Sequence, residues 1–168
     1  LTNNLLKTTI ELSRKKNKLI IVDPKKSDFS PYRGANIITP NFKELLEASK
    51  IKKNLKTEDD PNMVVRLSKE LLKKYSFDAI VTTRSSDGIS IVDKKNASLH
   101  LPSKAQEVFD VSGAGDTVIA YIASGVANGR SLFNATEIAN DAAGISVGKF
   151  GTTVVNEKDL LISNQKNK

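Results

Sequence analysis

The chain has 168 residues, 39% of them hydrophobic, which is enough to bury the core of about one domain. It has no cysteine, which excludes disulfides and thiolate metal sites, and no apolar run approaches the roughly 18 residues of a membrane span. The net charge of +7 favours anionic ligands, but the lysines are dispersed and aromatic residues make up only 5%, unlike a nucleic-acid-binding surface. With no signal peptide at residues 1–4, we expect a cytoplasmic protein without nucleic-acid or membrane partners.

The first forty residues predict a helix followed by two strands. Apolar residues recur at helical spacing over 5–16. The nearly continuous apolar run 18–23 predicts a buried parallel strand, which Pro24 ends. A polar loop follows, and 35–39 predicts a second strand that stops at Pro40.

A helix is predicted to begin directly after Pro40. Asn41 is followed three residues later by Glu44, the spacing of a capping box that contributes about 1 kcal/mol. From the chemistry of these residues alone, both side chains act as helix caps.

The middle of the chain predicts a helix and three strands. The helix begins at Asp60-Pro61, because proline is favoured in a first helical turn. The strands are predicted at 77–83, 89–93 and 98–101, with a hairpin turn at 94–96. The single histidine, His100, is expected to point off an edge strand, without a catalytic or metal-binding role.

The segment from Asp110 to Thr117, with the sequence D-V-S-G-A-G-D-T, is the most informative stretch. A short strand-like segment, 107–109, precedes it, and the apolar run 118–123 predicts a helix after it. Glycines allow a sharp turn, and the free amides of a helix start bind anions such as phosphate. Asp116 is then either a stabilising charge at a helix end or a general base beside a phosphate site.

The last part predicts two helices. Ser131 caps a helix over 132–147, whose small residues permit close packing against the preceding helix. A short helix is predicted at 158–162, and residues 164–168 are expected to form a flexible tail.

The glycine segment resembles the D-T-x-G-A-G-D signature of the ribokinase-like sugar kinases of the phosphofructokinase-B type, departing from it at Val111. The resemblance implies that Asp116 is the catalytic base. It also implies an anion hole formed by Gly113, Ala114 and Gly115. A monovalent-cation site is implied at Asp110 and Ser112.

The segment Thr39 to Glu44 is similar to a second signature of that family, T-P-N-x-x-E. The resemblance implies that Glu44 organises Mg²⁺ through water and that Asn41 lies near the nucleotide phosphates. Other residues that the resemblance places at the nucleotide are Phe42, Lys43 and Thr83, and on the adenine side Asn140 and Ala143. It further places carbonyls of Ser146, Lys149 and Gly151 at the monovalent cation.

Within the family, the pattern D-P-K-x-x-D-F-x-x-Y-R-G-A that begins at Asp23 resembles the kinases of D-glycero-β-D-manno-heptose 7-phosphate. This implies transfer of the γ-phosphoryl group of ATP to the anomeric hydroxyl, with Mg²⁺ and in many members K⁺. The product feeds ADP-heptose and lipopolysaccharide core synthesis. In many bacteria such a kinase is fused to a nucleotidyltransferase domain.

The resemblance implies a three-layer α/β/α fold with a mostly parallel sheet and an antiparallel hairpin. Residues 1–163 would be the C-terminal, nucleotide-binding part of the kinase domain, without most sugar contacts and therefore inactive alone. A different sugar or nucleoside kinase and a non-catalytic nucleotide-binding fragment stay open, as do monomer and homodimer. A dinucleotide-binding Rossmann domain is disfavoured, because no G-x-G-x-x-G follows the first strand.

Overall fold

The structure, a computed structural model, describes residues 2–51, 60–105 and 107–166. The chain forms two compact units. The first comprises residues 1–84 and 90–100, and the second comprises 85–89 and 101–168. Each unit is described separately below.

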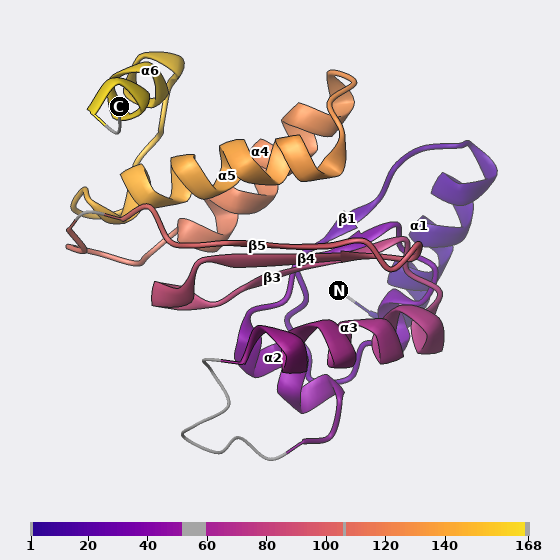
Figure 1. Cartoon of the computed structure of the whole chain (residues 1–168). Helices are drawn as coiled ribbons and strands as arrows, with labels where there is room; N and C mark the ends of the chain where they lie inside the picture. The colour runs from indigo at the N-terminus through magenta and orange to yellow at the C-terminus, as the bar shows by residue number, and fades with distance from the viewer. Residues whose placement is uncertain (1, 52–59, 106, 167–168) are drawn as a thin grey trace. The chain divides into compact units, whose positions relative to one another are not determined.

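The first unit is an α/β structure built on one sheet (Figure 1). Its helices are α1 (Asn3–Lys15), α2 (Phe42–Ala48) and α3 (Pro61–Tyr75), with a 3₁₀ turn η1 at Ser30–Tyr32. Its strands are β1 (Ile21–Val22), β2 (Ile37–Ile38), β3 (Ala79–Thr83), β4 (Ile89–Asp93) and β5 (Ser98–Leu101).

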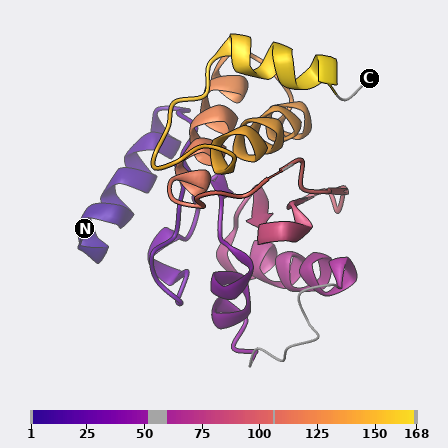
Figure 2. The ribbon, with the colours of Figure 1, turned by 90° about the vertical axis from the view of Figure 1, so that its left-hand side faces the viewer.

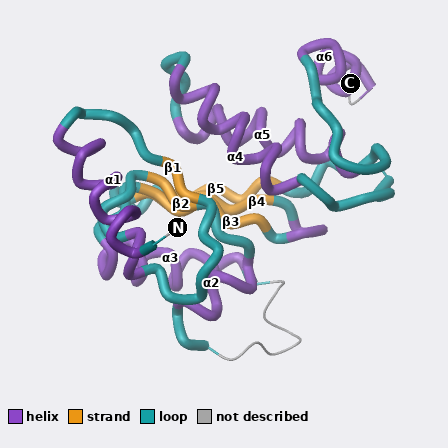
Figure 3. The backbone as a smooth tube through the Cα atoms, turned by 180° about the vertical axis from the view of Figure 1, so that it is seen from behind, coloured by secondary structure: helices purple, strands orange, loops and turns teal. Residues whose placement is uncertain are grey.

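The strands lie in the order β1-β2-β3-β4-β5 and gather into one sheet (Figure 3). The first three are parallel, with Ile37 opposite both Ile21 and Ala79. A four-residue connection joins β4 to β5, which only an antiparallel hairpin permits. The predicted α/β class, with a mostly parallel sheet and a hairpin, is therefore confirmed.

Helices α2 and α3 lie next to each other in both views of the ribbon (Figures 1 and 2). Both begin as predicted, because Asn41 caps α2 and Asp60 caps α3, with Pro61 in the first turn. Their apolar faces close the core of this unit around an aromatic cluster. The cluster consists of Phe29, Tyr32, Tyr75 and Phe77, with ring centroids 5.7–6.5 Å apart.

The prediction of a buried strand over 18–23 is only partly right. The strand covers Ile21–Val22 alone, and both residues are half-buried. Leu19 is 46% exposed. The reason is position: β1 is the outermost strand of the sheet in the described residues and has a neighbour on one side only.

The second unit contains three helices, α4 (Ala114–Ala127), α5 (Leu132–Val147) and α6 (Glu157–Lys166), and the 3₁₀ turn η2 (Ser85–Asp87). Helices α4 and α5 are joined by four residues and lie side by side. A Cβ built on Gly125 of α4 would lie 2.8 Å from Cβ of Ala135 on α5. The predicted close packing of small residues is confirmed.

One local prediction for the second unit is wrong, and the bounds of another are too short. Residues 107–109 do not form a strand, because the amides of Phe109 and Asp110 donate to the carbonyl of Val147 at the end of α5 instead of to a neighbouring strand. Helix α6 extends four residues past the predicted 158–162, into the segment expected to be a tail. Residues 167–168 of that tail lie outside the described residues.

None of the helices in the described ranges is both long and apolar enough to span a bilayer.

Candidate active site

In the first unit, two of the predicted nucleotide residues meet at the carboxyl ends of neighbouring parallel strands. Asn41 follows β2, Thr83 ends β3, and the two form an isolated parallel bridge. The amide of Thr83 donates to the carbonyl of Pro40 at 3.0 Å. Ligands of open α/β sheets bind at the carboxyl ends of the strands.

The capping box between Asn41 and Glu44 is present in full. The amide of Glu44 donates to Oδ1 of Asn41 at 2.9 Å, and the amide of Asn41 donates to Oε2 of Glu44 at 2.8 Å. One oxygen of the Glu44 carboxylate is therefore used by the cap, and its second oxygen, Oε1, accepts no hydrogen bond from the described residues.

Glu44 is half-buried, and burial raises the pKa of its carboxyl, with a further contribution from the negative charge of Asp23. The hydrogen bond from Asn41 and the charge of Lys25 act in the opposite direction. A nearby divalent cation would favour the ionised carboxylate and so act against the raised pKa.

Asp23 is a further candidate residue to which the sequence interpretation assigned no site role. It follows β1 directly, and its Oδ2 lies 2.6 Å from Nζ of Lys25. Its position was a usable signal. An acid immediately after a parallel strand lies at the carboxyl ends of the strands, as Asn41 and Thr83 do. Asp23 and Glu44 thus place two carboxylates at these strand ends.

Two other residues that were predicted to bind the nucleotide have side chains that contact other parts of the first unit. The side chain of Phe42 is 5% exposed and belongs to the core, so only its backbone is available to a ligand. Lys43 is exposed, and its Nζ lies 3.9 Å from Oε1 of Glu47 one turn later.

In the second unit, the glycine segment forms the start of α4. Gly113 precedes the helix with φ +79°, a left-handed conformation that glycine adopts without strain. A Cβ at Gly113 would also lie 3.2 Å from Cγ2 of Thr152. Both observations explain a glycine at this position.

The set of free amides at this helix start differs slightly from the predicted anion hole. Within the described part of the chain, the amides of Gly113, Gly115 and Asp116 have no hydrogen-bond acceptor. The amide of Ala114 instead donates to the carbonyl of Val111 at 3.3 Å. Free amides and the helix dipole together attract a phosphoryl group.

Asp116 lies in the first turn of α4 and is exposed. Its carboxylate makes no hydrogen bond or ion pair with any residue in the described ranges. An uncommitted carboxylate beside free amides can accept a proton from a hydroxyl group that attacks a bound phosphoryl group.

Asp110 connects two loops of the same unit. Its Oδ1 accepts the amide of Ser112 at 2.8 Å, and its Oδ2 accepts the amide of Gly151 at 3.2 Å. The hydrogen bonds from Ser112 lower the pKa of Asp110. The proposed cation residues Asp110 and Ser112 are thus adjacent, beside the loop that contains Gly151.

The two adenine-side residues on α5 differ in accessibility. Asn140 is 4% exposed, and its Nδ2 donates to the carbonyl of Pro102 at 2.9 Å. Ala143 is half-buried. The side-chain amide of Asn140 therefore holds the segment after β5, a role that the sequence did not indicate.

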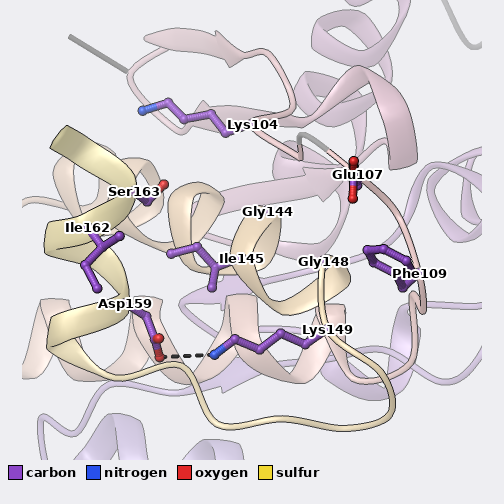
Figure 4. Close-up of a pocket in the computed structure, with 10 residues that line it drawn as sticks. All are labelled: Lys104, Glu107, Phe109, Gly144, Ile145, Gly148, Lys149, Asp159, Ile162 and Ser163. Carbon is purple, nitrogen blue, oxygen red and sulfur yellow. Dashed lines mark ion pairs between the residues drawn. The ribbon is translucent and has the colours of Figure 1, made fainter. Parts of the chain in front are cut away.

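A pocket of about 420 Å³ opens beside α5 and α6 (Figure 4). It contains neither Asn140 nor Ala143. Its lining includes Gly144 and Ile145 of α5 and the C-cap residue Gly148. Lys149 and Asp159 also line it and form an ion pair, with Nζ of Lys149 3.2 Å from Oδ2 of Asp159.

His100 does not point off the edge strand as predicted. Its Nδ1 lies 2.7 Å from Oγ of the buried Ser90 on β4. Burial lowers the pKa of His100, and the charge of Arg84 lowers it further. The side chain of His100 therefore contributes to packing within the β4–β5 hairpin.

Magnesium is compatible with the carboxylates that the structure brings together. Across residues 2–51, 60–105 and 107–166, no three side chains of His, Cys, Asp or Glu gather into a ready-made metal cluster. Mg²⁺ commonly takes one or two carboxylates and completes its shell with water and substrate phosphates. Asp23 and Glu44 match that donor set.

Comparisons with known proteins place the chain in a family. The sequence pattern of the pfkB family of carbohydrate kinases matches residues 1–159. Bifunctional protein HldE of Photobacterium profundum is 45% identical over 152 residues, which are 90% of this chain and 30% of that protein. The protein of the same name from Paramagnetospirillum magneticum is 44% identical over 157 residues, 92% of this chain and 31% of that protein. The chain therefore spans less than a third of the length of these relatives.

Solved structures agree on the fold. Phosphofructokinase-2 from Escherichia coli, in complex with potassium, matches 100% of this chain and 54% of its own with a TM-score of 0.84 and 18% identity. Ribokinase from Arabidopsis thaliana, complexed with ribose and ATP, matches 96% of this chain and 52% of its own with a TM-score of 0.79 and 19% identity. The expected ribokinase-like fold, present in part, is confirmed, and the chain belongs to the pfkB family of carbohydrate kinases.

Proposed function

We propose that the chain is the nucleotide-binding part of a kinase that phosphorylates D-glycero-β-D-manno-heptose 7-phosphate at its anomeric hydroxyl. The observation that carries the proposal is the exposed Asp116 beside the free amides that begin α4. The choice of sugar is supported by the motif that begins at Asp23 and by 45% identity to bifunctional HldE proteins.

In the proposed reaction, Asp116 accepts the proton of the sugar hydroxyl. The hydroxyl oxygen then forms a bond to the γ-phosphorus of ATP while the bond to the oxygen between the β- and γ-phosphates breaks, and ADP leaves. The amides of Gly113 and Gly115 stabilise the charge on the transferring group. The amide of Ala114 contributes if its 3.3 Å bond to Val111 opens.

For the nucleotide, we propose contacts from residues at the carboxyl ends of the strands in the first unit and from residues of α5 in the second unit. Asn41 and Thr83 lie near the phosphates, together with the backbone of Phe42 and with Lys43. Glu44 holds magnesium-bound water, with Asp23 as a second carboxylate, and Mg²⁺ when bound supplies charge neutralisation on the phosphates. Ala143 and the amide oxygen of Asn140 face the adenine.

For a monovalent cation such as K⁺, we propose the site around Asp110 and Ser112, with carbonyls of Ser146, Lys149 and Gly151. The hydrogen bond of Asp110 to the amide of Gly151 supports this grouping, because it holds both loops together.

For the parent protein, we propose a cytoplasmic kinase in which residues 1–163 end the kinase domain. The word bifunctional in the name of the relatives supports a second activity, and the resemblance implies that a nucleotidyltransferase domain carries it. The preceding part of the kinase domain would supply most sugar contacts, so this chain alone is expected to be inactive.

The proposal is tested with Asp116→Asn in the full-length protein, with heptose 7-phosphate and ATP as substrates and ³¹P NMR of the product. Turnover should fall by about 10²- to 10⁴-fold, the usual contribution of a general base. Affinity for ADP should stay within about twofold. Glu137→Gln, an exposed carboxylate on α5, is the control and should leave turnover unchanged.

Full turnover by the Asp116→Asn protein would remove the assignment of the base. Phosphorylation of another sugar in preference to heptose 7-phosphate would keep the kinase but replace its substrate.

A further inference from the structure

A second pocket lies in the first unit and contains none of the residues proposed to bind the nucleotide. Its volume is about 610 Å³, and the loop after β1 and the C-terminal ends of α2 and α3 form its walls. Three cationic side chains line it, namely Arg33, Lys50 and Lys74.

Two of these cations are held by one buried aromatic ring. The guanidinium carbon of Arg33 lies 5.6 Å from the centroid of the Tyr75 ring, and Nζ of Lys74 lies 4.8 Å from it. Tyr75 is only 3% exposed, and its hydroxyl donates to Oδ1 of Asp28 at 3.2 Å. A ring fixed in this way restricts the positions of both cationic groups. Contact with its π face leaves their N–H donors free for a ligand.

The carboxylates of the pocket make their direct contacts with other groups, although the charge of Lys74 contributes to the lowered pKa of Asp28. Asp28 accepts hydrogen bonds from the amide and hydroxyl of Ser30 and from Tyr75. Glu47 lies 3.9 Å from Nζ of Lys43 on the same helix. In the part of the chain that the structure describes, no acidic group lies within 4.0 Å of the charged nitrogens of Arg33, Lys50 or Lys74.

We propose that this pocket binds a sugar phosphate, with the phosphate held by Arg33, Lys50 and Lys74. A guanidinium presents two parallel donors to phosphate oxygens, and the ammonium groups add charge. The volume is in the range of small-molecule sites and exceeds the size of a phosphate alone. The hydroxyl of Ser27 and the carboxylate of Glu47 line the remaining space and suit the hydroxyls of a sugar.

The experiment is titration of the ¹⁵N-labelled 168-residue chain with glucose 6-phosphate as the probe, followed by amide shifts. We expect saturable shifts at Arg33, Lys74 and Tyr75, and at least tenfold weaker binding in the double variant Arg33→Gln/Lys74→Gln. Lys73→Gln is the matched control, because Lys73 is the neighbouring base in the last turn of α3 and does not line the pocket. It should bind within twofold of the unchanged chain.

Each other outcome decides against the inference. Equal weakening by Lys73→Gln would mean attraction by surface charge only. Equal affinity for inorganic phosphate would remove the sugar from the proposal. Shifts confined to Gly113 and Gly115 would support the anion site of α4 and overturn this one, so the two proposals fail separately. Unchanged dispersion of the remaining amide signals establishes that the variants are folded.

Discussion

At the scale of single residues, Glu44 combines an observed role as a helix cap with a proposed role at a metal ion. Its Oε2 completes the capping box with Asn41, and burial raises the pKa of its carboxyl. The cap needs a hydrogen-bond acceptor, whereas the proposed metal role needs a negative charge. Substitution can therefore separate the two roles.

Glu44→Gln keeps an acceptor for the amide of Asn41 and removes the charge. We expect its free energy of unfolding to stay within about 0.5 kcal/mol of the unchanged chain, while Glu44→Ala loses about 1 kcal/mol with the cap. Both variants should bind Mg·ADP at least fivefold more weakly. Urea denaturation and calorimetry measure the two effects, with Glu70→Gln, an exposed carboxylate on α3, as the control. Unchanged Mg·ADP affinity in Glu44→Gln would leave Glu44 a helix cap and nothing more.

Some residue roles could be read from the sequence and others could not. The capping box and the left-handed Gly113 are local, so spacing and residue type predict them. The bond of Asn140 to Pro102 joins residues 38 positions apart, and the sequence gives no sign of it. Asp23 was missed although its position directly after a parallel strand was a usable signal.

At the scale of elements, the packing of α4 on α5 depends on Gly125. Its missing Cβ leaves room for Ala135, so Gly125→Ala forces the helices apart and should cost about 1–3 kcal/mol of unfolding free energy. Gly115→Ala is the matched control in the same helix, because nothing lies within 4 Å of the added methyl group. It should stabilise by about 0.5 kcal/mol. Equal effects of the two substitutions in urea denaturation would contradict this packing.

Asp78 connects several elements of the first unit. It lies 2.7 Å from Nζ of Lys94 after β4 and 3.6 Å from a guanidinium nitrogen of Arg14 on α1, and Nδ2 of Asn36 donates to it at 2.7 Å. Burial alone would raise the pKa of Asp78, but these hydrogen bonds and charges outweigh it and hold the pKa below its ordinary value of 3.8.

Because the pKa of Asp78 is lower in the folded than in the unfolded chain, its ionised form stabilises the fold above about pH 4. This contribution is lost as pH falls through the lowered value. Asp78→Asn should be less stable than the unchanged chain at pH 7 and should lose less stability between pH 5 and pH 2. Denaturant titrations across this range test it, with Glu11→Gln on α1 as the exposed control. Parallel pH curves for Asp78→Asn and the unchanged chain would rule out this role.

Most element positions follow from local pattern, and the failures have tertiary causes. Strong periodicity and caps predict α3 and α5 well, with Pro61 and Ser131 at their starts. The apolar run 18–23 indicates a buried strand, yet in the described residues β1 is the outermost strand of the sheet and is less covered than a central strand. The segment 107–109 has strand-like residues but bonds to the end of α5.

At the scale of the whole molecule, the chain contains the residues proposed to bind phosphate and corresponds to only part of the family fold. It matches 54% of phosphofructokinase-2 from Escherichia coli. We therefore expect no turnover of heptose 7-phosphate by the isolated chain and turnover by the full-length protein, measured in the same ³¹P assay. Turnover by the isolated chain would show that the sugar pocket does not need the preceding part.

The central claim is that this chain carries a competent nucleotide site of a sugar kinase, and calorimetric titration with Mg·ADP, with and without K⁺, tests it most directly. The account predicts 1:1 binding that K⁺ strengthens and that Glu44→Gln weakens. Absence of binding heat at several temperatures, from a chain whose circular dichroism shows it to be folded, would contradict the claim.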